Sequence, residues 1–394
     1  MSSRFTFASR FDGVSGSAIR EIFKLLAVPG MISFAGGNPN PEYLNGEELA
    51  PIAERLLREK GRTLLQYGAT EGYGPLKESL TAYIKSQFDV DAAADEILPV
   101  TGSTQAMDLM CKALIDPGDK VVVEDPTFLG NMQCIRLYQA ELLPVPSDEE
   151  GMDMDALEEV LKKEHPKMIY VIPTFQNPTG RTLSLERRKR LAALAEKYRV
   201  VVAEDDPYRD LRYSGEALPS IKSFDQSGYV ALMGSFSKVI SPGLRVGFLN
   251  ADRELLRKCT VGKQSSDVHT ALLNQAVVDE YLRSGKLPGH VKMLCDGYRA
   301  RLNAMLAGLE KLPGIETYTR PEGGLFVFAA LREGLDATAL LQTAVDRGVA
   351  YVPGTHFYAE RGHDNTLRLN FSMPSVKEIS LGMQKLADAI KTAL

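Results

Sequence analysis

An amine, two hydroxyls and a guanidinium lie close together in one short segment. Ser235 and Ser237 flank Phe236, Lys238 follows directly, and Arg245 comes seven residues later. Hydroxyl and guanidinium groups donate hydrogen bonds to anions, so the segment could form an anion-binding site. Lys238 is a candidate nucleophile if burial or neighbouring cations keep its amine neutral. The alternative is a solvated surface lysine, which is the usual position of this residue type.

A second segment that could bind an anion is Thr101-Gly102-Ser103-Thr104-Gln105. It lies between a predicted strand and a predicted helix. A glycine there lets a ligand approach the backbone closely, and the free N–H groups of a helix start attract phosphate. The alternative is an ordinary helix N-cap at Ser103, which is favoured when the segment is considered alone.

Three consecutive acids, Glu204, Asp205 and Asp206, follow a predicted strand and precede Pro207 and Tyr208. Packing alone does not explain three carboxylates at a strand end. One of them could keep a nitrogen atom of a ligand protonated. The alternative is that Asp206 caps a helix that begins at Pro207. Both interpretations can hold for different residues.

Two further candidates are Asn177, in Asn-Pro-Thr-Gly, and Arg368, in Leu-Arg-Leu-Asn-Phe. An asparagine at the carboxyl end of a parallel strand lies where α/β proteins bind ligands. The alternative is a plain turn, since Asn-Pro and glycine favour turns. An arginine among apolar neighbours indicates a carboxylate partner, which is either internal or supplied by a ligand.

The elements expected around these residues alternate between strand and helix from about residue 97 to residue 250. The predicted strands are Ile97–Thr101, Lys120–Glu124, Lys167–Ile172, Val200–Glu204, Tyr229–Met233 and Arg245–Leu249, with helices at 103–115, 128–138 and 184–198. Short β-branched runs separated by helices predict a mainly parallel sheet covered on both faces.

The pattern changes after about residue 250. Helices are predicted at 252–261, 268–284, 288–311, 336–347 and 375–392, and strands at 315–318, 325–329 and 366–370. This order predicts a separate, smaller α+β domain. The first forty-odd residues have few sheet signals. We therefore expect an N-terminal arm at 1–46, a large domain at 47–285 and a small domain at 286–394.

The length of 394 residues suits two domains, and 44% hydrophobic residues suffice for their cores. The net charge of −5, with both signs interspersed, favours neither nucleic acid nor a membrane surface as partner. The longest apolar run, Leu325–Leu331, is too short to span a bilayer, and the N-terminus resembles no secretory signal. Four scattered cysteines and five unpaired histidines predict reduced thiols, no metal site and a cytoplasmic location.

Together and in this order, the segments resemble the fold type I enzymes that use pyridoxal 5'-phosphate (PLP), specifically the class I and II aminotransferases. The match covers nearly the whole chain. It is most specific in Gly-Ser-Phe-Ser-Lys-Val-Ile-Ser-Pro-Gly-Leu-Arg-Val-Gly around Lys238. Within the family, Ser17–Leu25 and Ile32–Pro41 resemble the branch of 2-aminoadipate and kynurenine aminotransferases. The resemblance implies a large domain with a mainly parallel sheet flanked by helices, plus a smaller α+β domain.

The resemblance also implies how the cofactor would be held. Lys238 would carry PLP as a Schiff base and, once released by the amino substrate, would move a proton. Asp205 would keep the pyridine nitrogen protonated, so that the ring can accept electrons. Tyr208 and Asn177 would hydrogen-bond the phenolic oxygen, and Phe128 would stack on the ring. The groups implied around the phosphate are the backbone of Ser103 and Thr104 and the side chains of Ser235, Ser237 and Arg245.

The remaining roles concern the partner subunit and the substrate. Tyr67 resembles the tyrosine that reaches the phosphate of the neighbouring subunit, which implies a homodimer with shared active sites. Arg368, with Asn177, would bind the substrate α-carboxylate, Gly37 would border the substrate, and Arg20 would lie near its side chain.

Arg20 is also a candidate gate for substrate choice. It lies in Ser17–Ala27, where apolar spacing predicts an amphipathic helix, and the nearby glycines could act as hinges. A mobile cation there would swing in for acidic substrates and out for aromatic ones. The alternative is a solvated helix residue.

The resemblance implies a ping-pong aminotransferase that uses 2-oxoglutarate, with glutamate or 2-aminoadipate and aromatic or large aliphatic amino acids as donors. The alternative is another PLP reaction on the same fold, such as a C–S β-lyase. A ligand-sensing domain of a transcription regulator is disfavoured, because only about 20 residues precede the first matched segment. A dehydrogenase is disfavoured because no Gly-x-Gly-x-x-Gly follows a strand.

Overall fold

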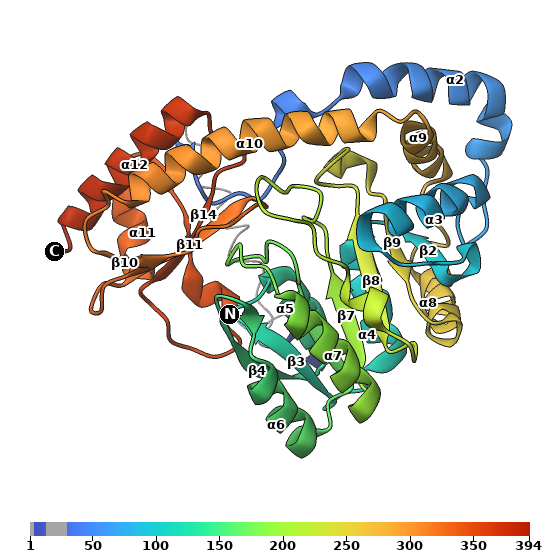
Figure 1. The fold of residues 1–394 in the computed structure, drawn as a ribbon, viewed down its shortest axis with the longest axis horizontal. Coiled ribbons are helices and arrows are strands. Elements are labelled where there is room, and N and C mark those ends of the chain that lie inside the picture. Colours follow the sequence, from blue (N-terminus) through green and yellow to red (C-terminus); the bar gives the residue numbers. More distant parts are fainter. Residues whose placement is uncertain (1–3, 13–29) are drawn as a thin grey trace.

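The structure is a computed structural model, and it describes residues 4–12 and 30–394 of the chain. Two main sheets organise these residues, one of eight strands and one of four (Figure 1). Within the described ranges, no helix has the length and apolar character needed to cross a membrane.

The eight-stranded sheet carries most of the predicted site. Its strands, in spatial order, are β2 (Ile97–Val100), β9 (Gly247–Asn250), β8 (Val230–Ser235), β7 (Val201–Asp205), β6 (Met168–Val171), β3 (Lys120–Asp125), β4 (Glu141–Asp148) and β5 (Gly151–Met152). All neighbours from β8 to β4 are parallel, whereas β9 runs antiparallel to β2 and β8, and β5 to β4. The prediction of a mainly parallel sheet is therefore confirmed. The carboxyl ends of β6 and β7 lie at the same edge, so the segments that follow them meet.

Helices cover both faces of this sheet, which explains why consecutive residues of its inner strands are apolar and buried. In β3, Val121 and Val123 belong to one buried cluster and Val122 belongs to another. The helices of this part are α2 (Gly46–Leu64), α3 (Gly74–Phe88), α4 (Ser103–Leu114), α5 (Leu129–Leu137), α6 (Met154–Glu164), α7 (Leu185–Tyr198), α8 (Arg253–Ser266) and α9 (Leu272–Arg283). Short 3₁₀ turns lie at Ser9–Phe11, Pro41–Tyr43, Ala94–Glu96, Ile221–Phe224, Pro242–Leu244 and Gly354–Phe357.

The smaller sheet is antiparallel throughout. Its order is β10 (Ile315–Tyr318), β11 (Phe326–Leu331), β14 (Thr366–Asn370) and β13 (Val352–Pro353). Its helices are α10 (Leu287–Leu309), α11 (Ala337–Asp346) and α12 (Val376–Lys391), and α10 runs beside α12 in Figure 1. The segment after Gly30 joins this part, because β1 (Ile32–Ser33) pairs in parallel with β12 (Val349–Ala350). The domain bounds given above stay a prediction.

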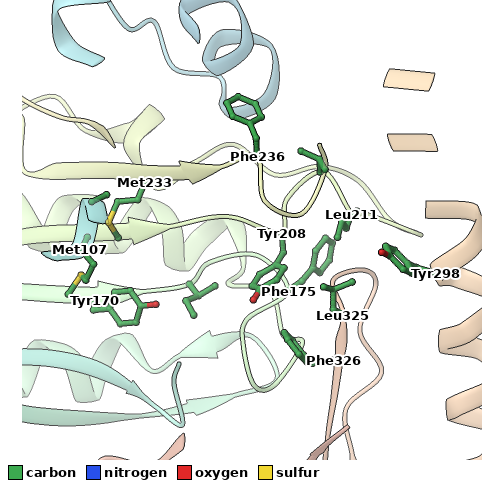
Figure 2. Packing of buried hydrophobic residues seen from close by; sticks show 14 of the residues in the cluster. Met107, Tyr170, Phe175, Tyr208, Leu211, Met233, Phe236, Tyr298, Leu325 and Phe326 are labelled. Carbon is green, nitrogen blue, oxygen red and sulfur yellow. The ribbon is translucent and has the colours of Figure 1, made fainter. Parts of the chain in front are cut away.

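Apolar packing fixes the approach of the two parts to each other. Figure 2 shows Phe175 and Tyr208, from the loops after β6 and β7, beside Leu325, which precedes β11, and Phe326, its first residue. The rings of Tyr208 and Phe326 meet edge to face, with centroids 5.8 Å apart. Gly180 has φ +71°, and a Cβ there would lie 2.7 Å from the Phe326 carbonyl oxygen. This close contact brings residues 177–180, Asn-Pro-Thr-Gly, against β11, which is the neighbour of β14 in the smaller sheet.

Candidate active site

Arg368 and Asn177 meet where the two sheets come together. Arg368, in the middle of β14, is 2% exposed and donates to Asn177 Oδ1 at 2.9 Å. It also donates to the carbonyl oxygens of Ala35, at 2.8 Å, and Gly36, at 3.1 Å. All three acceptors are neutral, and its Nε is buried with no hydrogen-bond partner among the described residues. The alternative of an internal salt bridge is therefore not seen in the described part of the chain.

Aromatic rings surround Arg368, and no acidic side chain among the described residues pairs with it. Its guanidinium stacks against the rings of Phe326, 4.3 Å from the centroid, and Phe357, at 4.9 Å. Burial lowers the pKa of Arg368 to about 10. A desolvated cation that lacks a counter-charge attracts an anion strongly, because little water screens it. The arrangement can therefore bind a carboxylate in a bidentate pair.

The three consecutive acids have three separate environments. Glu204 accepts hydrogen bonds from Ser220 and from two backbone N–H groups, which ties down the turn at Ile221–Phe224. Asp206 forms a buried ion pair with Arg209 at 2.9 Å. No helix begins at Pro207, so the alternative of a helix cap at Asp206 is wrong.

Asp205 and Asp206 each have one buried oxygen without a donor, but only Asp206 has a cationic partner, Arg209, among the described residues. Asp205 Oδ2 accepts from Tyr170 OH at 3.0 Å and from Asn131 Nδ2 at 3.1 Å. Its Oδ1 is buried and has no donor among the described residues. Burial raises the pKa of Asp205 to about 7, although the Tyr170 hydrogen bond opposes the shift. A buried carboxylate oxygen without a donor is costly, so it indicates a place for a donor from a ligand.

Lys238 lies between these groups and is half-buried, which excludes the alternative of a solvated surface lysine. Its Nζ donates to the Gly37 carbonyl oxygen at 2.7 Å and lies 5.8 Å from the centroid of the Tyr208 ring. Burial lowers the pKa of Lys238 to about 8, and the positive charges of Arg368 and Arg245 add to the shift. The neutral amine is therefore a minority form near physiological pH, but far more abundant than for an ordinary lysine, and it can act as a nucleophile.

Tyr208 and Asn177 flank the amine. Asn177 Nδ2 donates to Tyr208 OH at 3.5 Å, so the two side chains form one short chain of polar contacts that ends at Arg368. Burial raises the pKa of the Tyr208 hydroxyl. Asn177 does lie in a turn, as the alternative expected, but its amide is buried and points to the other candidates.

The two segments predicted to bind an anion also come together. Arg245 Nη2 donates to the Thr101 carbonyl oxygen at 3.1 Å, and Nη1 donates to Ser237 Oγ at 3.2 Å. Ser235 Oγ donates to Ser237 Oγ at 3.1 Å. These contacts join the end of β8 to the junction between β2 and α4.

The start of α4 is open to a ligand. Ser103 is its first helical residue and Gly102 is the N-cap, so the alternative of an N-cap at Ser103 is wrong. Gly102 has φ +82° and no side chain that could cap, which leaves the first N–H groups, near Ser103 and Thr104, free of a side-chain acceptor. We call Gly102–Thr104 together with Ser235, Ser237 and Arg245 the cradle.

The other candidates differ in how the structure places them. Phe128 is half-buried directly before α5, and its ring lies over Gly130, where a Cβ would be within 2.6 Å of it. Tyr67 is 81% exposed and meets the His269 ring edge to face. Arg20 lies outside the described residues, as does its expected helix.

Sequence reasoning missed Tyr170, Asn131 and Lys263. Tyr170 and Asn131 hold Asp205, and Lys263 is a wholly buried lysine in α8. No motif contains them, and Tyr170 reads as an ordinary aromatic in a strand. The one available signal was the alternation of side chains along β6. It places Tyr170 on the same face as Met168, in the larger buried cluster, but does not indicate the hydrogen bond to Asp205.

Known proteins share both the sequence and this arrangement. A profile of the class I and II aminotransferases matches residues 30–386. This chain belongs to that family. It is 41% identical over 391 residues to aromatic-amino-acid aminotransferase 1 of Thermococcus litoralis. The alignment covers 98% of this chain and 94% of that protein.

Solved structures agree with the sequence match. The multiple substrate aminotransferase of Thermococcus profundus superposes with a TM-score of 0.93 at 40% identity, covering 98% of this chain and 97% of that chain. The alpha-aminoadipate aminotransferase of Thermus thermophilus, complexed with N-(5'-phosphopyridoxyl)-L-leucine, superposes with a TM-score of 0.91 at 41% identity and the same coverage. The predicted family, fold type and cofactor are therefore confirmed, and the protein is a PLP-dependent aminotransferase.

The residues present fit PLP. A protonated pyridine nitrogen is a donor, and Asp205 Oδ1 is a buried acceptor that lacks one. The cofactor phosphate is an anion, and Arg245 lies against the uncapped start of α4. The aldehyde requires a neutral amine, and Lys238 has a lowered pKa.

Proposed function

We propose that this aminotransferase takes glutamate or 2-aminoadipate, and also aromatic or large aliphatic amino acids, as donors and 2-oxoglutarate as acceptor. The two half-reactions alternate at Lys238 in a ping-pong order. Support comes from the relatives, whose names include aromatic amino acids, alpha-aminoadipate and multiple substrates. The observation that carries the proposal is the buried Arg368, whose acceptors are all neutral oxygens.

Arg368 is proposed to bind the α-carboxylate that every donor and acceptor shares. Asn177 holds one side of its guanidinium, and the carbonyl oxygens of Ala35 and Gly36 hold the other, so its position is fixed before substrate arrives. Gly37 would border the bound substrate, since its carbonyl oxygen contacts Lys238 Nζ.

Five side chains are proposed to hold the cofactor ring. Lys238 carries it covalently, Asp205 accepts from the pyridine nitrogen, Tyr208 and Asn177 bond its phenolic oxygen, and Phe128 stacks on its face. When bound, PLP supplies an electron-accepting ring that stabilises negative charge on the substrate Cα. Lys238 Nζ, once released, removes the proton from Cα. The cradle residues proposed for the phosphate are Ser103, Thr104, Ser235, Ser237 and Arg245.

A second cation is needed for acidic side chains, because an unpaired carboxylate in a closed site is costly. Arg20 is proposed for this role, and its removal should raise KM for acidic substrates while sparing aromatic ones. A homodimer is also proposed, with Tyr67 of one subunit serving the other. A cytoplasmic location is proposed on the basis of four scattered cysteines, all free thiols in the structure.

The test is a panel of amino acids incubated with 2-oxoglutarate and the purified holoenzyme. We expect glutamate or 2-aminoadipate and at least one aromatic amino acid to give their 2-oxo acids together with the amino product of the acceptor. The alternative C–S β-lyase uses the same lysine, acid and arginine. Release of ammonia and pyruvate from cysteine conjugates, without transfer to 2-oxoglutarate, would favour that alternative.

A further inference from the structure

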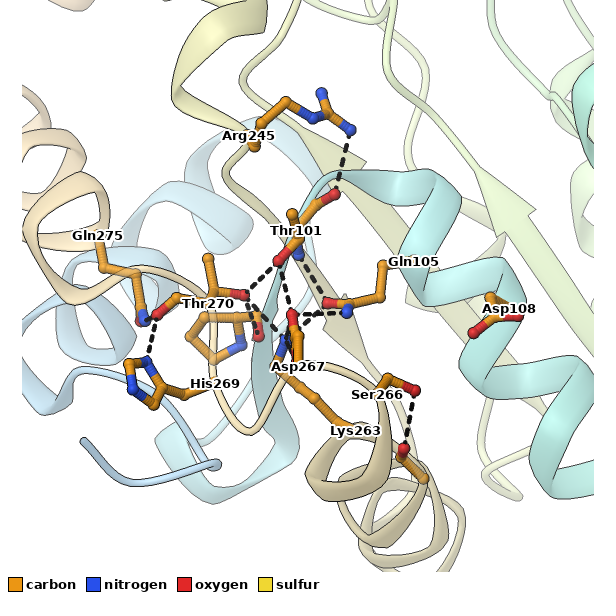
Figure 3. Close-up of polar contacts among 12 residues, drawn as sticks. Thr101, Gln105, Asp108, Arg245, Lys263, Ser266, Asp267, His269, Thr270 and Gln275 are labelled. Atoms are coloured by element: carbon orange, nitrogen blue, oxygen red, sulfur yellow. Dashed lines mark hydrogen bonds and ion pairs between the residues drawn. The ribbon is translucent and has the colours of Figure 1, made fainter. Parts of the chain in front are cut away.

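A buried cation lies behind the junction of β2 and α4. Lys263, in the last turn of α8, is fully buried. Its Nζ lies 2.6 Å from Gln105 Oε1, 3.0 Å from both carboxylate oxygens of Asp267 and 3.0 Å from Thr270 Oγ1 (Figure 3). These contacts satisfy the three N–H donors of an ammonium group.

Lys263 fixes the orientation of the Gln105 amide. Because Lys263 can only donate, Gln105 must turn its oxygen toward Nζ and its nitrogen away. Gln105 Nε2 then donates to Asp267 Oδ2 at 2.7 Å, and Gln105 Oε1 accepts from the Thr101 backbone N–H at 2.8 Å. Without the lysine, the amide could flip and lose both contacts.

Asp267 holds the same threonine from its side chain. Thr101 Oγ1 donates to Asp267 Oδ2 at 2.9 Å and contacts Thr270 Oγ1 at 3.1 Å. Thr101 is therefore fixed at its backbone nitrogen and at its hydroxyl by groups that all contact Lys263. Figure 3 shows these side chains converging between α8 and the start of α4.

The restrained threonine is part of the cradle's own framework. Its carbonyl oxygen accepts from Arg245 Nη2 at 3.1 Å, and the next residue, Gly102, is the N-cap of α4. A rotation of the peptide at Thr101 would move the Arg245 guanidinium and redirect the first N–H groups of the helix. Both are groups proposed above to bind the cofactor phosphate.

If Lys263 contributed only to the stability of the fold, an apolar side chain of similar volume would serve at least as well. Buried ion pairs often add little to stability, because desolvation offsets their attraction, whereas a fully bonded network specifies one arrangement. We propose that Lys263 is a positioning residue for the phosphate of PLP, acting through Gln105, Asp267 and Thr101 without touching the cofactor. This inference rests on the proposed assignment of the phosphate to the cradle.

The test compares PLP with pyridoxal, which has the same ring and aldehyde and no phosphate. The apoenzyme variants are Lys263→Met and the control Lys112→Met. Lys112 is exposed and also joins α4 to α8, through Ser266 Oγ at 2.6 Å. We expect Lys263→Met to raise the Kd for PLP about tenfold or more, because the groups that bind the phosphate would no longer be held in place before binding. The Kd for pyridoxal should stay within about twofold of its original value. Lys112→Met should change neither.

A second variant covers the case in which Lys263→Met does not fold. Asp267→Asn keeps the shape of a partly exposed side chain and removes the counter-charge of Lys263, so the same phosphate-specific loss is expected. Equal weakening of PLP and pyridoxal, or no weakening, in the folded variant would overturn the proposal. A wild-type apoenzyme that bound both compounds equally would instead overturn the phosphate assignment itself, so the two failures are distinguishable.

Discussion

At the scale of single residues, the site depends on ionisable side chains held away from their ordinary pKa. Burial raises the pKa of Asp205 to about 7 and lowers that of Lys238 to about 8. Each shift reflects a free-energy cost in the ligand-free protein that the proposed partner would relieve: a pyridinium for Asp205, and covalent attachment for Lys238.

Asp205→Asn should therefore stabilise the apoenzyme while it damages catalysis. The folded-state pKa of Asp205 lies above its ordinary value of 3.8, so its ionisation destabilises the fold increasingly as pH rises. The increase in the free energy of unfolding caused by Asp205→Asn should be absent below about pH 4 and should grow up to about pH 7. Above that pH it should stay at about 1–4 kcal/mol. Urea unfolding of the apoenzyme at several pH values measures it, and turnover of the PLP-loaded variant should fall by orders of magnitude.

Asp206→Asn is the matched control. Asp206 has a buried ion pair with Arg209 and a hydrogen bond from Thr174, so the same change should destabilise the apoenzyme. Stabilisation by Asp206→Asn, together with unchanged turnover in Asp205→Asn, would mean that the two acids have been assigned the wrong way round.

The sequence could name these residues but could not separate them. The motif Glu-Asp-Asp-Pro-Tyr offers three adjacent carboxylates, and their differences arise from Tyr170, Arg209 and Ser220, which are contributed by other segments or by the following loop. The alternatives of a cap at Ser103 and at Asp206 were both local interpretations, and both were wrong because the tertiary environment decided the backbone conformation.

At the scale of elements, strand ends and one helix start place the chemistry. The segments after β6 and β7 carry Asn177 and Tyr208, the end of β8 precedes Lys238, and α4 begins at the cradle. This follows from the general rule that α/β sheets bind ligands at the carboxyl ends of their strands. The order of these elements was predictable because each has a strong local signal.

Some elements had no such signal. β4 contains Pro144 and Pro146, which cannot donate to a ladder and argue against a strand, yet it pairs in parallel with β3 next to the edge of the sheet. α2 has a proline inside it and buries only Leu56 and Leu64 among its side chains. These features explain why α2 and β4 were not predicted, whereas α3 was missed although it buries Leu76, Leu80, Ile84 and Phe88 at helical spacing.

Gly102→Ala tests the helix start. Gly102 has φ +82°, and a Cβ there would collide with the Arg245 guanidinium. We expect the Kd of the apoenzyme for PLP to rise about tenfold or more, since the collision displaces the group proposed to bind the phosphate. The measurement is a fluorescence titration of the apoenzyme with PLP.

Gly118→Ala controls for backbone strain in that experiment. Gly118 also has positive φ, +89°, but a Cβ there meets nothing within 4 Å and lies away from the cradle. It should lose a similar amount of stability and keep its affinity for PLP. If both variants weaken PLP binding equally, strain rather than the cradle is responsible.

At the scale of the whole molecule, the site is assembled from distant segments. Arg368 and Asn177 are 191 residues apart in sequence, and Lys238 and Gly37 are 201 apart. No spacing rule predicts such contacts, and the resemblance to a family placed these residues in one site without giving the contacts themselves. Tyr67, 81% exposed, and Leu65, 72% exposed, lie at the end of α2, where a partner subunit would cover them.

A mixing experiment tests the proposed sharing of active sites. Lys238→Ala and Tyr67→Ala subunits, unfolded together and refolded, should form heterodimers in which one site has both Lys238 and a partner's tyrosine. We expect the mixture to gain activity above the sum of the two separately refolded variants. No gain, in a preparation shown to contain heterodimers, would place Tyr67 in its own subunit's site or in none.

The central claim is that Lys238 carries the cofactor, and borohydride reduction of the purified holoenzyme tests it directly. Reduction makes the carbon–nitrogen bond between cofactor and lysine permanent, so peptide mass spectrometry can locate it. We expect the added mass of a phosphopyridoxyl group on the peptide that contains Lys238, and none in Lys238→Ala. Modification of another lysine, such as Lys263, or the absence of any modified peptide from a yellow holoenzyme would contradict it.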